Sequence, residues 1–184
     1  MIILYLIVSL ASLVVLLAVV TFILIQILAA FTTDAPFVSV PSHMEEEIIK
    51  ALELNNNSKL YDLGCGDARI LLKAVQQYPK IKAVGVDMAF FPYLLAKFYT
   101  RRFKNIKIQR DNIFSTDISE ATHVFLYLFP EVVTKLMPIL KGQCKVGTRI
   151  VSCDFECTDQ KPSEVILIKD SGQKRGKKLF VYVV

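Results

Sequence analysis

The chain opens with a long apolar run whose only polar side chains are those of Tyr5, Ser9, Ser12, Thr21 and Gln26. As an α-helix, these roughly 30 residues would reach about 45 Å, more than the roughly 30 Å apolar core of a bilayer. The alternatives are a buried soluble helix and a cleaved signal peptide. A signal peptide needs a basic start and a shorter apolar stretch, whereas the first Lys or Arg here is Lys50. We therefore expect a retained transmembrane anchor at 1–31 and an extended linker at 32–41.

Over 42–184, short apolar runs alternate with longer stretches of helical periodicity. The short runs predict strands at 59–63, 83–87, 106–110, 123–128 and 149–154, and the longer stretches predict helices at 42–54, 68–77, 91–102 and 131–141. This alternation is typical of a doubly wound, mostly parallel α/β sheet. Two final β-rich runs, 164–169 and 178–184, predict an antiparallel hairpin at the sheet edge, although 155–163 is short for a parallel crossover before it. Ser42 and Glu45 predict a capping box at the first helix.

Charge is confined to the part of the chain that follows the apolar run. That part carries all 22 Lys and Arg and all 17 Asp and Glu, which gives a net charge of +5. We interpret the basic cluster at 97–110 as a solvated helix face rather than a nucleic-acid patch. In an anchored protein such a face can also meet anionic headgroups. We expect free thiols, no metal site and a reducing, cytoplasmic location, because no C-x-x-C spacing or nearby His accompanies the cysteines Cys65, Cys144, Cys153 and Cys157.

Acidic side chains are expected at the carboxyl ends of the first three strands, where open α/β sheets bind their ligands. The first strand runs into the sequence DLGCGD at 62–67, whose two glycines let the backbone turn sharply and approach a ligand. Asp87 ends the second strand and could accept hydrogen bonds from ribose hydroxyls. Asp111 and Asn112 end the third and could hold an adenine edge. Together these residues predict one adenosine site.

The cofactor predicted at this site is S-adenosylmethionine rather than a nucleotide. A dinucleotide site would have a third glycine where this chain has Arg69, and Asp67 places negative charge where a pyrophosphate would bind. S-adenosylmethionine carries no phosphate, and its sulfonium and ammonium groups would be attracted by Asp62 and Asp67.

These motifs resemble those of the class I, seven-strand S-adenosylmethionine-dependent methyltransferases, and the resemblance covers about 42–184. Within that class the chain is similar to the small protein-lysine methyltransferases, both the archaeal enzymes and the mitochondrial family acting on the ATP synthase c-subunit. The segments that carry the resemblance are YDLGCGDARI at 61–70, GVD at 85–87, DN at 111–112, VFLYLFP at 124–130 and GTRIVSCDFE at 147–156. Two positions depart from the family pattern. Ala68 replaces a common glycine, which we expect to be mild at a helix start, and Asp87 replaces a frequent glutamate, which shortens the reach to the ribose.

The resemblance implies roles for individual residues. The cofactor contacts would be Asp62, Gly64, Gly66, Asp67, Arg69, Asp87, Met88, Asp111, Asn112 and Leu128. The methyl-acceptor pocket would be bordered by Tyr127, Phe129 and Pro130, with Asp154 at the next strand end, and Tyr127 is the candidate catalytic residue. Methyl transfer to lysine requires alignment and an uncharged amine, so we expect this pocket to act by positioning rather than through a dedicated base. We expect His123 to begin a strand.

We therefore expect a membrane-anchored S-adenosylmethionine-dependent methyltransferase that methylates lysine in a protein near the membrane. Its catalytic domain would lie in the cytoplasm or the mitochondrial matrix, act as a monomer and bind no nucleic acid. A lipid or quinone-like acceptor and a non-catalytic cofactor-binding module are the open alternatives. We also expect Asp87→Ala to abolish cofactor binding while leaving the fold intact.

Overall fold

The computed structural model describes residues 1–32, 39–168 and 175–184, and the chain divides into two compact units, Met1–Pro36 and Phe37–Val184. The first unit holds one helix, α1 (Ile2–Thr32), whose side chains are exposed throughout 2–26. Within the described residues, Ile2–Gln26 is the one stretch of helix long and apolar enough to cross a membrane. A helix that is apolar on every side requires apolar surroundings. The predicted N-terminal helix is confirmed, while its insertion into a membrane stays a prediction.

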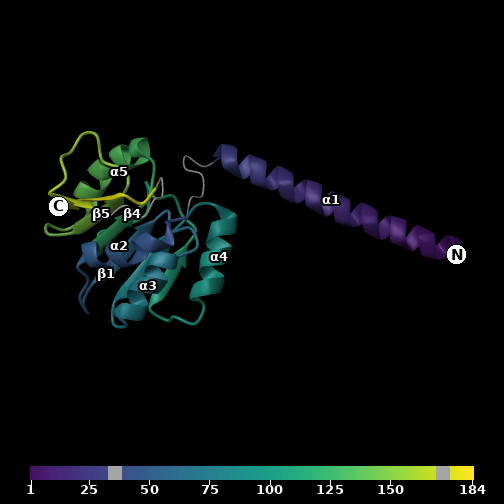
Figure 1. The fold of residues 1–184 in the computed structure, drawn as a ribbon, viewed down its shortest axis with the longest axis horizontal. Coiled ribbons are helices and arrows are strands. Elements are labelled where there is room, and N and C mark those ends of the chain that lie inside the picture. The colour runs from purple at the N-terminus through teal and green to yellow at the C-terminus, as the bar shows by residue number, and fades with distance from the viewer. Residues whose placement is uncertain (33–38, 169–174) are drawn as a thin grey trace. The chain divides into compact units, whose positions relative to one another are not determined.

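The second unit contains a seven-stranded sheet flanked by helices (Figure 1). Its elements, in chain order, are a 3-10 turn (Ser42–Met44), α2 (Glu45–Leu52), β1 (Lys59–Leu63), α3 (Arg69–Gln77), β2 (Lys82–Val86), α4 (Phe90–Thr100), β3 (Ile106–Gln109), β4 (His123–Leu126), α5 (Pro130–Gln143), β5 (Arg149–Cys153), β6 (Glu164–Leu167) and β7 (Lys178–Val183). The strand order across the sheet is β3-β2-β1-β4-β5-β7-β6.

Strands β1 to β5 pair in parallel, whereas β7 pairs antiparallel with both β5 and β6. The predicted doubly wound sheet with a terminal antiparallel hairpin is therefore confirmed. Strand β7 lies between β5 and β6 and is antiparallel to both, so β6 runs in the same direction as β5 without pairing with it. The short connection at 154–163 contains no helix.

The core lies on both faces of the sheet. Helices α2 and α3 belong to one buried cluster with Leu60, Phe125 and Val151. Successive strand side chains alternate between faces, so the buried Val124 and Leu126 point to the other side. The buried side chains of α5 lie outside the first cluster, as expected for a helix that covers this other face. The four cysteines are free and buried, as predicted.

Several element boundaries differ from the predicted ones. The predicted capping box is wrong, because neither the 3-10 turn nor α2 receives a side-chain cap hydrogen bond, and Met44 N donates to Pro41 O instead. Four of the five parallel strands end before their predicted last residues, at Val86, Gln109, Leu126 and Cys153, and β7 ends one residue early, at Val183. The residues that follow the four parallel strands lie in loops at the carboxyl edge of the sheet. Residue 169 of the predicted strand 164–169 lies outside the described residues.

Candidate cofactor and acceptor site

The loop of residues 64–68 that follows β1, the glycine loop, makes a tight backbone turn. Its first position has a conformation that favours glycine. Gly64 and Gly66 have φ of 82° and 56°, in the left-handed region that L side chains avoid. A Cβ placed on Gly64 would lie 2.8 Å from Cδ2 of Leu128. The N–H groups of Gly64 and Cys65 both donate to the carbonyl oxygen of Val86, at 2.8 and 3.0 Å. The loop is thereby held against the end of β2.

Ala68, at the end of this loop, has a conformation that its place in the sequence does not predict. It precedes α3 with φ of 64° and ψ of 23°, so it adopts the left-handed conformation rather than that of a first helical residue. Ala68 thus lies at the helix start as expected, but its left-handed conformation adds strain that the expectation did not include. Its side chain is fully buried, which compensates for part of the strain.

Asp87 connects the second strand to the glycine loop. Its Oδ2 accepts a hydrogen bond from the Gly66 N–H at 2.9 Å, and its Oδ1 accepts one from the Ala89 N–H at 2.9 Å. Burial raises the pKa of this carboxyl group, although both backbone hydrogen bonds lower it. A carboxylate has about four lone-pair sites, so two remain for the ribose hydroxyls that we expect Asp87 to bind.

Asp62 supplies a buried negative charge beneath the same loop. Its side chain is almost fully buried, and no described residue donates a hydrogen bond to its carboxylate. Burial raises the pKa of Asp62 well above its ordinary value, and the negative charges of Asp87 and Asp67 add to this effect. A buried carboxylate without a partner is costly, and a cationic ligand would remove that cost. S-adenosylmethionine, which carries an ammonium and a sulfonium group, fits this chemistry.

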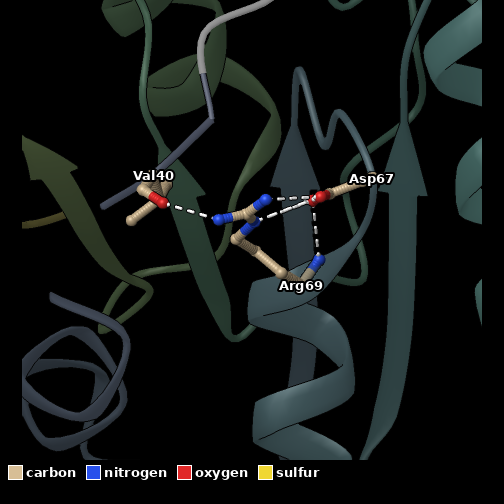
Figure 2. A network of polar contacts seen from close by, with 3 residues as sticks. All are labelled: Val40, Asp67 and Arg69. Carbon is tan, nitrogen blue, oxygen red and sulfur yellow. Dashed lines mark hydrogen bonds and ion pairs between the residues drawn. The ribbon is translucent and has the colours of Figure 1, made fainter. Parts of the chain in front are cut away.

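Arg69 forms a network that ties the glycine loop to the segment before α2 (Figure 2). Its guanidinium donates to the Asp67 carboxylate, with Nη2 2.6 Å from Oδ2, and to the carbonyl oxygen of Val40 at 2.9 Å. The charge of Asp67 is therefore balanced within the protein. Asp62 and Asp87, rather than Asp67, supply the net negative charge at this site.

The end of β3 lies beside the end of β2, because Val86 is paired with Gln109 and the Asp87 N–H donates to the Gln109 carbonyl at 3.1 Å. Asp111 follows and accepts hydrogen bonds from the Asn112 N–H at 2.8 Å and the Thr116 hydroxyl at 3.1 Å. Asn112 uses its amide oxygen to accept the Phe114 N–H, which leaves its amide nitrogen to donate to an adenine edge. Met88, in the loop between β2 and α4, is 42% exposed. The three predicted strand ends thus meet at one edge.

Aromatic side chains gather where β4 and β5 end. Tyr127 stacks on Phe155 with ring centroids 5.9 Å apart, and Phe129 lies 5.7 Å from the same ring. Pro130 follows as the first residue of α5. Burial raises the pKa of Tyr127, so its hydroxyl stays protonated at neutral pH. Phe155 is not among the predicted site residues, although its position two residues after the end of β5 places it at the carboxyl edge.

The Asp154 side chain accepts hydrogen bonds from backbone N–H groups of the segment before β7. Its carboxylate accepts hydrogen bonds from the N–H groups of Gly176 at 2.7 Å and Lys177 at 2.8 Å, and its own φ is 60°. Both oxygens are thus engaged with the residues that lead into β7. Its predicted role at the acceptor channel stays a prediction.

Asp62, Asp67, Arg69 and the glycine loop share one small pocket with Tyr127, whereas Asp111 lines a separate groove. This pocket, of about 20 Å³, is lined by Val40, Asp62, Arg69, Phe125 and Tyr127 together with the glycine loop. A larger groove of about 750 Å³ is lined by residues of β1, β2 and β3, among them Tyr61, Val84 and Lys107. We assign the chemistry to the small pocket, because it joins the unpartnered carboxylate of Asp62 to the aromatic group at Tyr127.

Comparison with known proteins identifies relatives in sequence. Residues 62–164 match the family described as the ANTKMT methyltransferase domain. A protein-lysine N-methyltransferase of Saccharolobus islandicus is 32% identical over 157 residues, which cover 83% of this chain and 96% of that protein. The adenine nucleotide translocase lysine N-methyltransferase of Mus musculus is 26% identical, covering 72% of this chain and 58% of that relative. A lysine N-methyltransferase of Caenorhabditis elegans that is named for the ATP synthase c-subunit is also 26% identical, covering 65% and 66%. The chain thus spans less than two thirds of the latter two proteins.

Solved structures with the same fold hold the product of the predicted cofactor. An RNA methyltransferase from Salinibacter ruber in complex with S-adenosyl-L-homocysteine superposes with a TM-score of 0.73 at 28% identity, covering 80% of this chain and 94% of that one. A methyltransferase from Geobacter sulfurreducens with the same ligand has a TM-score of 0.57 at 14% identity, covering 71% and 54%, and shares the fold alone.

Proposed function

Because the chain belongs to the ANTKMT methyltransferase family and is an S-adenosylmethionine-dependent methyltransferase, we propose that it methylates the ε-amino group of lysine in a membrane-proximal protein. The observation that carries the proposal is the 32% identity to a protein-lysine N-methyltransferase, over 83% of this chain and 96% of that protein. The names of two further relatives also specify lysine in a protein.

The residues of the site support lysine as acceptor. When bound, S-adenosylmethionine supplies an electrophilic methyl group on a positively charged sulfur. Asp62 and Asp87 would hold the cofactor's cationic and ribose parts. The rings of Tyr127, Phe129 and Phe155 form an aromatic wall beside which a charged amine is poorly solvated, so the uncharged form that can attack is favoured.

Positioning, rather than proton abstraction by the protein, is the contribution we assign to Tyr127. Its raised pKa makes it a poor base at neutral pH, but its hydroxyl can orient an amine by hydrogen bonding. His123 is no alternative base, because it begins β4 at the opposite edge of the sheet and its Nδ1 lies 2.8 Å from the Thr122 hydroxyl. The proton of the lysine would therefore leave to solvent before transfer.

Membrane attachment is the second part of the proposal. We divide the chain into an anchor at 1–31, a linker at 32–41 and a methyltransferase domain at 42–184. The helix α1 supports this division, since it is apolar on all sides and without charge. The domain would face the cytoplasm or the mitochondrial matrix, where the cofactor is available.

Labelled cofactor tests the acceptor class directly. The full chain, reconstituted in vesicles, is incubated with methyl-labelled S-adenosylmethionine and a membrane extract, and label is followed into protein, lipid and RNA. We expect label in a protein band, with mass spectrometry locating methyl groups on lysine. The Asp87→Ala variant serves as the inactive control. Label in lipid alone would contradict the proposal.

RNA is the second candidate acceptor, favoured by the likeness to the Salinibacter ruber enzyme. The same experiment decides between them, because label that is sensitive to ribonuclease and resistant to protease would identify RNA.

A further inference from the structure

Helix α4 carries an exposed apolar stripe on the side that faces away from the sheet. Phe90, Leu94 and Phe98 are 55%, 44% and 57% exposed. Their spacing of four residues places them along one side of the helix, because each residue turns the helix by about 100°. The buried residues Pro92 and Ala96 lie on the opposite side. A contiguous stripe of large apolar side chains marks an interaction surface.

The segment around α4 accounts for the positive charge of the whole chain. Between Met88 and Arg110 there are six Lys and Arg and no Asp or Glu, whereas the net charge of the chain is +5, so all other residues together have a net charge of −1. The cations border the apolar stripe. The Arg101 guanidinium lies 4.0 Å from the ring centroid of Phe98, and that of Arg110 lies 5.3 Å from the ring of Phe90.

An anionic bilayer surface fits both properties. Apolar side chains of an interfacial helix enter the boundary between headgroups and acyl chains to a depth of about 5–10 Å, while neighbouring Lys and Arg extend to the phosphates. Each cation close to such a surface contributes about 1 kcal/mol. A protein partner would instead need an acidic rim around an apolar groove.

The proposed anchor α1 would keep the catalytic unit attached to a bilayer. Helix α1 is apolar throughout, and the residues between Thr32 and Ser39 can span at most about 25 Å. A membrane that contains α1 is therefore within reach of the catalytic unit. Helix α4 itself begins three residues after Asp87, so a surface that binds α4 also lies near the carboxyl edge of the sheet.

We propose that α4 is a membrane-docking helix, whose stripe of Phe90, Leu94 and Phe98 inserts among the headgroups of an anionic leaflet while the surrounding cations bind lipid phosphates. The proposal rests on the membrane attachment proposed above and adds the orientation of the catalytic unit. Docking through α4 brings the cofactor and acceptor pocket close to the bilayer, where lysines of membrane proteins emerge.

Tryptophan fluorescence tests this orientation, because the chain contains no Trp and a single introduced one reports its own surroundings. The full chain with Phe98→Trp is reconstituted in vesicles of zwitterionic lipid, with or without phosphatidylglycerol, and with brominated phospholipid as quencher. At interfacial depth we expect blue-shifted emission that the quencher lowers about two-fold in anionic vesicles. High salt should weaken the quenching. The matched control is Val146→Trp, which is 94% exposed in the turn before β5 and should stay unquenched.

Flotation of the same samples separates the two proposals. A chain that floats with the vesicles while Phe98→Trp stays unquenched overturns docking but not attachment, and a chain that does not float overturns both. The double substitution Arg101→Glu and Arg102→Glu should reduce quenching while the chain still floats. Unchanged quenching in that variant would overturn the role of the cations. Quenching that requires an added acceptor protein would identify α4 as a protein interface and overturn the proposal.

Discussion

At the scale of single residues, Asp62 links the pH dependence of stability to the cofactor. Burial and the nearby Asp87 and Asp67 raise its pKa well above the ordinary value. Such a group stabilises the fold below its unfolded pKa, near 4, and this contribution is lost as pH rises through the folded pKa. The cofactor-free chain should therefore lose stability as pH rises from about 4, and Asp62→Asn should remove this loss. Denaturation midpoints from circular dichroism in detergent, measured across pH, provide the test.

Asp62→Asn should weaken cofactor binding, although it removes a loss of stability. Loss of a charged hydrogen bond costs about 1.5–3 kcal/mol, so we expect a dissociation constant raised about 10- to 100-fold. Calorimetric titration with S-adenosyl-L-homocysteine, which keeps the ammonium group, measures this change. Asp117→Asn, a substitution of an exposed acid outside the site, is the matched control. Equal affinities of the two variants would contradict our assignment of Asp62.

Gly64→Ala and Ala68→Gly, two substitutions in the same loop, should change the free energy of unfolding by different amounts. Gly64→Ala adds a left-handed strain of about 1–2 kcal/mol, and its Cβ would also meet Leu128 at 2.8 Å. Ala68→Gly relieves the same strain but loses a buried methyl worth about 0.8 kcal/mol and adds about 0.4–1 kcal/mol of unfolded-state entropy. We expect the first to lower the free energy of unfolding by more than about 1 kcal/mol and the second to change it by less than about 0.5 kcal/mol. Urea titrations of both variants measure the difference, and a strongly stabilised Ala68→Gly would contradict this balance.

At the scale of elements, Asp154 joins the end of β5 to the start of β7. Asp154→Ala would leave the N–H groups of Gly176 and Lys177 without their acceptor, so we expect a loss of about 1–3 kcal/mol in the free energy of unfolding. Asp154→Asn keeps an acceptor oxygen and should lose less. Steady-state kinetics adds the second measurement. An acceptor KM unchanged in Asp154→Asn would assign the residue to the fold, whereas a raised KM with unchanged stability would assign it to the acceptor channel.

The order of elements could be predicted from local pattern, but their arrangement could not. The strand Lys59–Leu63 has its predicted limits, because apolar residues end where the glycine loop begins. Leu128 extends an apolar run beyond the true end of β4 at Leu126, since its side chain is buried against Gly64 from a loop. The place of β7 between β5 and β6 depends on pairing between distant residues, which no short window of sequence records.

The candidate site was predictable where it depends on strand ends and not where it depends on contacts between loops. Asp62, Asp87 and Asp111 follow successive strands, so topology alone brings them to one edge. The bond from Arg69 to the Val40 carbonyl joins residues that are 29 positions apart, and the stack of Phe155 on Tyr127 joins two loops. Neither leaves a periodic signal in the sequence.

At the scale of the whole molecule, a short tether and a charged docking helix predict that methylation depends on sharing a bilayer with the acceptor. Attachment to one surface replaces bulk concentration by an effective concentration that dilution does not change. We therefore expect that diluting vesicles about ten-fold leaves methylation per enzyme unchanged when enzyme and acceptor share vesicles, and lowers it about ten-fold when they occupy separate ones. Label incorporation into a lysine-containing membrane protein measures both cases. Equal rates in shared and separate vesicles would show that the catalytic unit acts from solution. A soluble lysine peptide controls for intrinsic activity, because its methylation rate should not depend on how the vesicles are arranged.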